Sequence, residues 1–410
     1  MKVKAIKYLF LLLSATACAQ QSKTNKIEPV IAKVKPVKIG LSNPIPAADL
    51  TEKYLPSLEG KTIAIVANQT SMVGSVHLVD TLLSLGINVK NVFAPEHGFR
   101  GNADAGEKVK DGKDRKSGLP IISLYGKNLK PSAERFEGID LILFDIQDVG
   151  ARFYTYISTM TYMMEACAEQ DVPMMILDRP NPNGHYVDGP VLDSKFKSFV
   201  GMHPIPVVHG MTMGEYAQMV NGEYWLKDSV QCNISVVEMD HYNHNSIYEL
   251  PVKPSPNLPN MKSIYLYPSL CFFEGTIVSA GRGTDNPFQL FGYPKMPNTE
   301  FDFTPRSIKG AASNPKFKGK KCSGVDLSTK PDSSLRAISR LDLSWLINAF
   351  KDYKNNGKDF FDPKFFDLLA GSDILRKQIQ SGKSIQEIED SWKSDLQEFK
   401  KIRKKYLIYD

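Results

Sequence analysis

The sequence has 410 residues, of which 42% are hydrophobic and 23% are charged, and its formal net charge is +6. This composition excludes a wholly disordered chain, and the length suffices for two domains. Lysines and arginines gather near the two ends without interleaved aromatic residues, so we expect no nucleic-acid partner.

The first eighteen residues, MKVKAIKYLFLLLSATAC, have the pattern of a secretory signal peptide. Lysines precede a short apolar stretch, and small residues precede Cys18. Residues 15–18 also resemble a bacterial lipobox, in which the cysteine becomes the lipidated N-terminus; simple cleavage and secretion is the alternative. We therefore expect an exported protein, periplasmic or outer-membrane-associated, with a lipid on Cys18 holding it to a membrane. Residues 19–45 are predicted to form a flexible tether.

Beyond the tether, apolar runs typical of buried strands alternate with helical periodicity. Strands are predicted over 61–68, 87–93, 119–124, 139–146 and 172–178, and helices over 76–85 and 157–170. This alternation predicts an α/β fold, with a parallel sheet covered by helices on both faces. The first strand leads into NQTSMVG without a GxGxxG or P-loop motif, so no dinucleotide or other cofactor is expected.

From about residue 260 the pattern changes. Amphipathic helices are predicted over 334–350 and 384–409. We therefore predict a first domain over 46–262 and a smaller α/β domain over 263–410.

The four cysteines downstream of Cys18 have irregular spacing, which favours small buried thiols over two disulfides. They are Cys167, Cys232, Cys271 and Cys322. Neither a CxxC motif nor a Cys/His cluster is present, so no metal site is predicted.

Polar residues follow four of the predicted strands, and the carboxyl ends of parallel strands meet at one edge of a sheet. After the second strand, EHGFRG places Glu96, His97 and Arg100 together. A partly buried carboxyl group here is a candidate general acid. The alternative is a polar loop with a surface salt bridge.

The segment DIQDVGARFYTY provides Asp145, Asp148, Arg152 and Tyr154. The two carboxylates could bind a cation, hold sugar hydroxyls or orient Arg152. The alternative is an ion pair that caps the next helix.

DRPNPNG, after the strand over 172–178, contributes Asp178, Arg179 and Asn181, of which the first and last are candidate hydroxyl-binding groups. In HGMTMGEY, the residues Thr212 and Glu215 have the spacing of a capping box, which leaves His209 to face the substrate.

EGTIVSAGRGT adds Glu274 and Arg282. An arginine between glycines projects a guanidinium group suited to a carboxylate, and a plain surface turn is the alternative. The proline-rich segment 254–260 suits a hinge or a cleft wall. No serine lies in a GxSxG elbow, which argues against a serine hydrolase.

Taken together and in order, these motifs resemble the bacterial DUF1343 family, the NamZ-type exo-β-N-acetylmuramidases of glycoside hydrolase family 171. The resemblance rests on AP-EHG-FRG, FDIQDVGARFYTYI, LDRPNP-G, GPVLD, SFVG with HGMT-GE, PSPN-P and EGT followed by GRGT-PF, and it runs from about residue 60 to 295. It implies a Rossmann-like catalytic domain, a smaller auxiliary domain and a cleft between them. The implied activity releases terminal β-1,4-linked N-acetylmuramic acid from the non-reducing end of peptidoglycan fragments.

By motif position, the resemblance makes Glu96 the catalytic acid and groups it with His97, Asp145 and Asp148 as catalytic candidates. Motif positions also place in or near the cleft Arg100, Arg152, Tyr154, Asp178, Arg179, Glu274 and Arg282. Together with Asn181 and His209, which the local motifs suggest, these are the candidate substrate-binding residues. The stretch before PSPN lacks the tryptophans of many family members and reads HNSIYELPVK, so sugar preference is open. Two alternatives remain: a non-catalytic muropeptide-binding lipoprotein and a hydrolase of a different amino sugar. Retention, inversion and attack by the substrate's own acetamido group are equally open.

Overall fold

The computed structural model describes residues 43–100, 111–126, 128–353 and 359–410. The predicted signal peptide, Cys18 and nearly all of the predicted tether lie outside these residues. The described part of the chain contains no helix that is both long and apolar enough to cross a membrane. The described residues belong to one compact unit.

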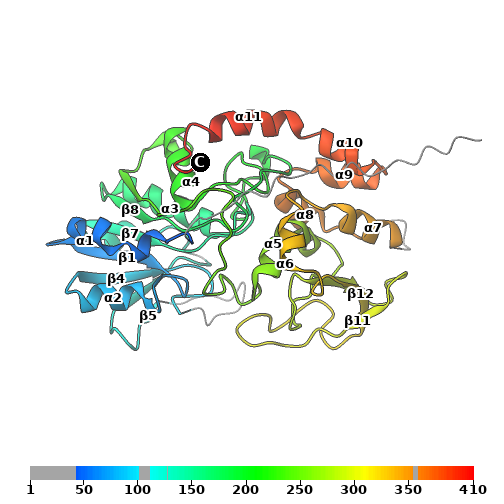
Figure 1. Ribbon diagram of the computed structural model, residues 1–410, viewed down its shortest axis with the longest axis horizontal. Helices are drawn as coiled ribbons and strands as arrows, with labels where there is room; N and C mark the ends of the chain where they lie inside the picture. Colours follow the sequence, from blue (N-terminus) through cyan, green and yellow to red (C-terminus); the bar gives the residue numbers. More distant parts are fainter. Residues whose placement is uncertain (1–42, 101–110, 127, 354–358) are drawn as a thin grey trace, which may run out of the picture. The chain divides into compact units, whose positions relative to one another are not determined.

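Seven strands form the main sheet, in the order β5-β6-β4-β1-β7-β8-β9 (Figure 1). All neighbours are parallel except β5, which runs antiparallel to β6. The six parallel strands follow the order 3-2-1-4-5-6 of Rossmann folds, which confirms the predicted fold class. The bounds of the seven strands are β1 Thr62–Ala67, β4 Asn88–Ala94, β5 Gly112–Lys113, β6 Pro120–Ser123, β7 Leu141–Asp145, β8 Met174–Leu177 and β9 Ile234–Val237.

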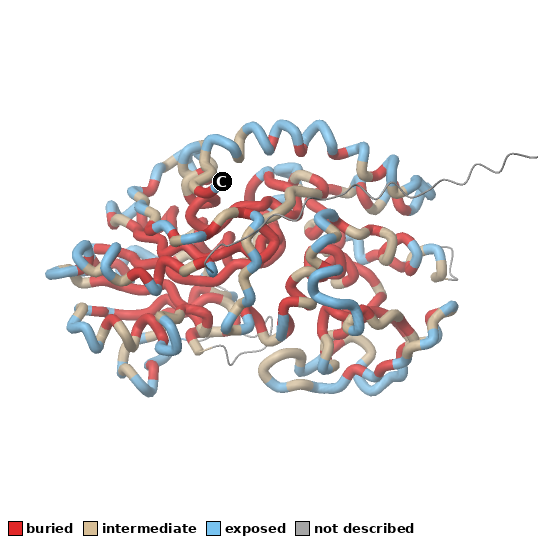
Figure 2. The backbone as a smooth tube through the Cα atoms, viewed as in Figure 1, coloured by how far each residue is buried: buried red, intermediate tan, exposed pale blue. Residues whose placement is uncertain are grey.

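Alternation along β1 explains why the sheet is buried on both faces. Ala64 and Val66 belong to one hydrophobic cluster, whereas Ile63 and Ile65 belong to another. Successive side chains of a strand point to opposite faces, so a fully apolar run requires cover on both sides. Figure 2 shows the strands of this sheet as buried through most of their length.

Helices α1 and α2 contribute to the cluster on one face of the sheet, and α3 and α4 contribute to the cluster on the other. Their bounds are α1 Thr51–Leu58, α2 Leu78–Ser84, α3 Tyr156–Glu169 and α4 Met213–Gly222. The predicted capping box of α4 is confirmed, because Thr212 and Glu215 bond to each other's backbone N–H. The helix predicted over 76–85 starts two residues late, because Val76–His77 form the short strand β3, which pairs with β2 Met72–Val73.

The C-terminal third carries a three-stranded antiparallel sheet in the order β10-β12-β11, with most of its helices following. The strands are β10 Leu290–Tyr293, β11 Phe301–Phe303 and β12 Cys322–Asp326. The helices are α5 Met261–Leu270, α6 Asp332–Arg336, α7 Ser344–Asp352, α8 Pro363–Ala370, α9 Ile374–Gln380, α10 Ile385–Asp390 and α11 Lys393–Arg403. Short 3₁₀ turns cover Ala47–Asp49, Ala133–Phe136, Ser194–Phe196, Lys227–Ser229 and Cys271–Gly275.

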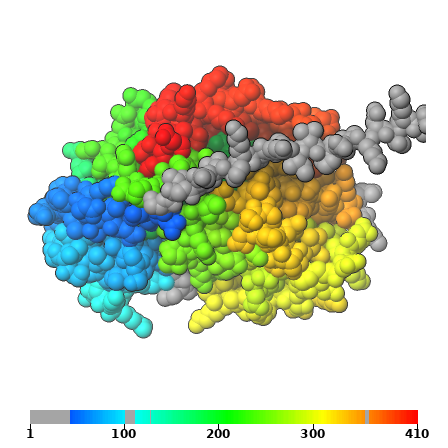
Figure 3. Space-filling model, viewed as in Figure 1, coloured from blue at the N-terminus to red at the C-terminus, as the bar shows by residue number. Residues whose placement is uncertain are grey.

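Two helix predictions were wrong in length. The region 334–350 forms α6 and α7 rather than one helix, because Asp342 accepts a bond from the Ser344 N–H and starts a new helix there. The region 384–409 likewise divides into α10 and α11. Figure 3 shows α11 lying on the surface of the molecule.

The four described cysteines, Cys167, Cys232, Cys271 and Cys322, are buried free thiols. One continuous hydrophobic cluster contains residues of both predicted domains, among them Phe153 and Phe272, whose ring centroids lie 5.9 Å apart.

Candidate active site

A cavity of about 990 Å³ opens beside the carboxyl end of β4 and the start of α3. Residues of the main sheet's loops and of the C-terminal third both line it. Its wall is rich in aromatic side chains, a common feature of sugar-binding sites: Tyr125, Phe153, Tyr154, Tyr156, Phe199, Tyr267, Phe288 and Phe365. Carboxylates in this lining are Glu96 and Glu274, and the cations are Arg282, Lys309 and Lys316.

Glu96 lies on the cavity wall, two residues beyond the end of β4. The hydroxyl of Thr155 donates a 3.0 Å hydrogen bond to its Oε2 atom. Burial and the neighbouring Glu96 carboxylate raise the pKa of the Tyr125 phenol, which stays protonated as a hydrogen-bond donor at neutral pH. Glu96 is therefore a half-buried carboxyl group held between two hydroxyl-bearing side chains.

His97 is almost completely buried, and its Nε2 atom lies 3.1 Å from the hydroxyl oxygen of Ser255. Its backbone φ is +70°, a conformation that side-chain-bearing residues rarely adopt. Such strain persists where surrounding contacts enforce it, and it clusters at functional sites. Here the strain turns the chain directly after Glu96.

The carbonyl oxygen of Pro254, beside Glu96 and His97, links its own segment to the loop after β1 and to the start of α3. It accepts hydrogen bonds from Tyr154 at 2.8 Å, from Gln69 at 3.0 Å and from Tyr156 at 3.4 Å. Asn257, three residues on, donates to the Ala311 carbonyl in the loop on another part of the cavity wall. The segment suggested as a cleft wall therefore lines the cavity and ties its parts together.

Glu274 and Arg282 form an ion pair on the cavity wall, with 2.9 Å between Oε2 and Nε. The guanidinium carbon lies 4.9 Å from the centroid of the Phe288 ring. The terminal nitrogens of Arg282 make no hydrogen bond to another described residue, and its side chain is 25% exposed. Arg282 thus presents two fixed N–H edges suited to an anion.

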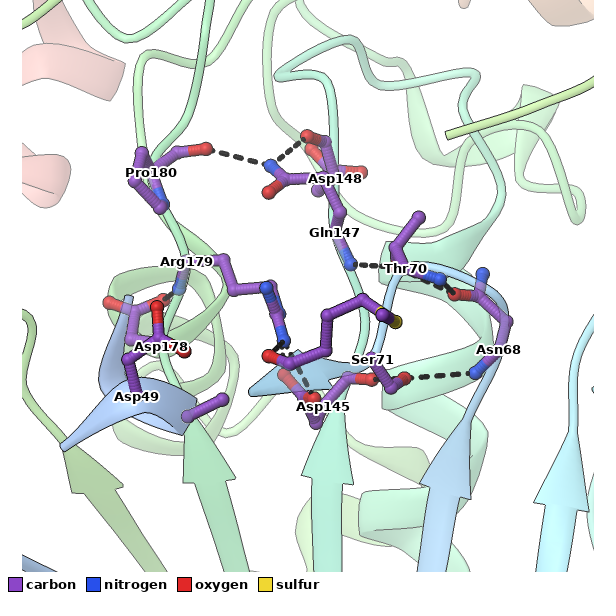
Figure 4. A network of polar contacts seen from close by, with 12 residues as sticks. Asp49, Asn68, Thr70, Ser71, Asp145, Gln147, Asp148, Asp178, Arg179 and Pro180 are labelled. Carbon is purple, nitrogen blue, oxygen red and sulfur yellow. Dashed lines mark hydrogen bonds and ion pairs between the residues drawn. The ribbon is translucent and has the colours of Figure 1, made fainter. Parts of the chain in front are cut away.

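Asp145, the last residue of β7, pairs with Arg179, which follows β8 (Figure 4). Neither residue lines the cavity. The Nε–Oδ1 and Nη2–Oδ2 distances are 2.5 and 2.8 Å, and both side chains are buried. Arg179 also donates to the Met72 carbonyl. This pair bridges the ends of β7 and β8, next to the point between β1 and β7 where Rossmann folds commonly bind a ligand.

Asp148, Asp178, Asn181 and His209 are buried beside that pair and do not line the cavity either. The Nε2 atom of His209 lies 3.9 Å from Oδ2 of Asp148. Burial raises the pKa of Asp148 to about 7 and lowers that of His209 to about 3, so the two side chains do not form an ion pair. Asp178 accepts hydrogen bonds from Thr212, Gly214 and Tyr409, and burial raises its pKa to about 6. Asn181 donates to the Met211 carbonyl.

Two predicted substrate-binding arginines have protein partners instead. Arg152 is fully buried and donates to the carbonyls of Pro190, Ile205 and Leu369. Arg100 pairs with Asp80 and Asp114. Neither lines the cavity.

Of the thirteen candidates, the structure places on the cavity wall Glu96, His97, Tyr154, Glu274 and Arg282. It places elsewhere Arg100, Asp145, Asp148, Arg152, Asp178, Arg179, Asn181 and His209. Side chains in the wall that the sequence analysis did not single out include Tyr125, Thr155, Phe199, Ser255, Asn257 and Lys316. Only the PSPN motif gave a signal for Ser255 and Asn257. Across the described ranges, no group of three or more His, Cys, Asp or Glu side chains is arranged to hold a metal ion.

Comparison with known proteins gives three concordant findings. Two family models match, "Exo-beta-N-acetylmuramidase NamZ, N-terminal" over residues 63–262 and "Exo-beta-N-acetylmuramidase NamZ, C-terminal" over 265–409. The chain is 38% identical over 420 aligned positions to peptidoglycan beta-N-acetylmuramidase NamZ of Bacillus subtilis, covering 98% of this chain and 97% of the relative.

Crystal structures of two DUF1343 family proteins from Bacteroides fragilis are also similar. One is 51% identical with a TM-score of 0.84, and the other is 27% identical with a TM-score of 0.73. Each comparison covers 90% of this chain and 99% of the other.

Proposed function

Because both family models and a full-length relative match, the chain belongs to the NamZ family of exo-β-N-acetylmuramidases, and we propose that it is an exo-acting glycosidase of peptidoglycan. In this proposal it releases terminal β-1,4-linked N-acetylmuramic acid from the non-reducing end of peptidoglycan fragments. The observation that carries the chemistry is the half-buried Glu96, which Thr155 holds at the wall of the large cavity.

Glu96 acts as the general acid. Glycoside cleavage requires a carboxylic acid that protonates the leaving oxygen as the bond to the anomeric carbon breaks. Thr155 fixes one carboxyl oxygen of Glu96, which holds the carboxyl group at the cavity wall, where a glycosidic oxygen can approach it. The aromatic wall offers faces on which a pyranose ring can stack.

Arg282 binds the lactyl carboxylate that distinguishes N-acetylmuramic acid from N-acetylglucosamine. Its Nε atom is occupied by Glu274 and its face by Phe288, which leaves the terminal N–H groups for a second carboxylate. A guanidinium held in this way recognises a carboxylate with two parallel hydrogen bonds.

Glu96→Gln, assayed on two muramides, tests the acid. A β-1,4-linked disaccharide has a poor leaving group that needs the proton, whereas 4-nitrophenyl β-N-acetylmuramide has a good leaving group that needs it less. We expect kcat to fall by about 10²–10⁴-fold on the disaccharide and by much less on the nitrophenyl glycoside. Glu134→Gln, at a fully exposed carboxylate, is the matched control.

Equal losses of kcat on both substrates would contradict the role of Glu96 as general acid. Full activity of the variant would show that Glu96 takes no part in the reaction. Saturable muramide binding by the folded wild type without any product would contradict the enzyme itself. Comparison with 4-nitrophenyl β-N-acetylglucosaminide tests the choice of sugar.

We also propose export and lipid anchoring, on the strength of the first eighteen residues and Cys18. The site of action is then the periplasm or the outer membrane. Labelling of the wild type with radioactive palmitate, lost in Cys18→Ala, is the expected result. A labelled Cys18→Ala protein would contradict the anchor, and unlabelled wild type in the culture medium would indicate simple secretion.

A further inference from the structure

The ammonium group of Lys316 lies inside a cage of backbone carbonyl oxygens beside the cavity. Its Nζ atom is 2.9 Å from the oxygen of Phe273, 3.0 Å from that of Glu274, 2.6 Å from that of Thr276 and 3.3 Å from that of Val278. An ammonium group has three N–H donors, so four carbonyls share them. Such a ring of carbonyl oxygens is the kind of environment that also binds a potassium ion.

The cage carbonyls belong to the turn over residues 273–278. Phe273 O also accepts from the N–H and the hydroxyl of Thr276, and that hydroxyl accepts from the Val278 N–H. Among the described residues, Lys316 is the one donor to the carbonyls of Glu274, Thr276 and Val278. Thr276 and Val278 are buried, and buried carbonyls without a donor are costly. The shape of this turn therefore depends on a cation at its centre.

This turn carries the ion pair of the proposed carboxylate site. Glu274 supplies one cage carbonyl through its backbone and holds Arg282 through its side chain. Burial lowers the pKa of Lys316, and the nearby Glu274 carboxylate opposes that effect. Lys316 and Arg282 thus place two cations around one carboxylate, on the wall of a cavity proposed to receive an anionic sugar.

We propose that Lys316 is a positioning residue whose ammonium group serves as a built-in monovalent cation, fixing the turn that presents Glu274 and Arg282 to the substrate. The part of this inference that concerns the substrate rests on the function proposed above. The binding of a cation in the cage is independent of that function.

Lys316→Met removes the charge and keeps the length of the side chain. We expect it to raise KM for 4-nitrophenyl β-N-acetylmuramide by about tenfold or more, with a smaller change in kcat, because Arg282 loses its fixed orientation. Lys318→Met is the matched control, since Lys318 lies on the same loop, is exposed and contacts one carbonyl, that of Ser313. It should leave both constants unchanged.

Lys316→Ala empties the cage and allows chemical rescue. At constant ionic strength, ammonium or potassium chloride should increase the kcat/KM of this variant by about fivefold or more and should raise its Tm. Lithium or tetramethylammonium chloride should do neither, because these ions do not match the cage. Wild type and Lys318→Met should respond equally to all four salts.

Wild-type KM in Lys316→Met would overturn the positioning role. Equal effects of all four salts on Lys316→Ala would overturn the cage. Failure of both variants to fold in every salt would also overturn the proposal, because the residue would then serve the whole fold rather than the site. An inactive wild type would instead count against the proposed function, and the Tm response of Lys316→Ala to potassium against lithium would still decide the cage.

Discussion

The hydroxyl of Thr155 donates its hydrogen bond to the carboxylate of Glu96 across 59 positions of sequence, at a distance of 3.0 Å. Thr155 is the residue immediately before α3, a position at which a threonine side chain commonly caps its own helix. Here it makes no such cap. Its hydroxyl instead joins the helix to the loop after β4, so the packing of α3 on the sheet sets the position of the proposed acid.

Thr155→Val removes this hydrogen bond and keeps the shape of the side chain. We expect kcat/KM on a muramyl disaccharide to fall about fivefold, which corresponds to the ~1 kcal/mol of one hydrogen bond. Thr159→Val, one turn further along α3, is the control, because the Thr159 hydroxyl donates to the backbone carbonyl of Thr155 rather than to Glu96. A fully active Thr155→Val enzyme would show that Glu96 needs no such support.

Arg282→Met should weaken recognition of the lactyl carboxylate. A charged hydrogen-bonded pair contributes about 1.5–3 kcal/mol, so KM for the muramide should rise by about 10–100-fold. A substrate in which the lactyl group is an uncharged amide should bind wild type and variant with similar KM values. Arg306→Met serves as control, since that side chain is 56% exposed and pairs with Asp285 at the surface. Equal loss on both substrates would argue against a carboxylate contact.

Asp145→Asn should destabilise the fold rather than selectively impair catalysis. Asp145 and Arg179 are buried, and removal of one partner leaves the other charge unpaired, at a cost of about 3–5 kcal/mol in the free energy of unfolding. The double variant Asp145→Leu with Arg179→Met should recover part of the loss. Urea unfolding measures both, and Asp285→Asn in the exposed pair should change stability by less than about 1 kcal/mol. A stable but inactive Asp145→Asn protein would return Asp145 to the catalytic set.

Acid should destabilise the protein through His203. Burial lowers the pKa of His203 to about 3, from the 6.5 of an exposed histidine. Below pH 6.5 the His203 side chain binds a proton in the unfolded chain but stays neutral in the folded state. Its contribution to the free energy of unfolding is therefore lost as the pH falls. Wild type should therefore lose up to about 1.4 kcal/mol per pH unit more than His203→Gln. Urea unfolding between pH 7 and 4.5 measures the difference.

The raised pKa of Asp148, about 7, acts in the opposite direction and favours the folded state as the pH falls. Asp148 is present in both proteins, so its contribution cancels in the comparison. Parallel stability curves for wild type and His203→Gln would contradict a lowered pKa of His203.

Local sequence patterns predicted most of the sheet. The run from Thr62 to Ala67 is apolar on both faces, and only a covered central strand satisfies such a run. The capping box of Thr212 and Glu215 is equally local, because both partners lie within one helical turn. Helix lengths near the C-terminus were harder to predict, since the apolar periodicity continues through the break at Asp342 and hides it.

Residue type and motif did not reveal which candidates would line the cavity and which would be buried away from it. Asp145, Asp148 and Arg152 belong to the same motif as Tyr154. Their side chains bond inward to buried partners, whereas Tyr154 reaches the cavity wall. A shift of one or two residues beyond a strand end decides between these positions, and it depends on packing by distant segments.

The sequence by itself determined the α/β class and the family, because these depend on periodicity and on motif order along the chain. Only the tertiary structure decided which polar groups share the cavity. Glu96 meets Thr155, His97 meets Ser255, and Glu274 meets Lys316 because strands and loops far apart in sequence pack together. The physical reason is that hydrogen bonds act over about 3 Å in space and carry no record of separation along the chain.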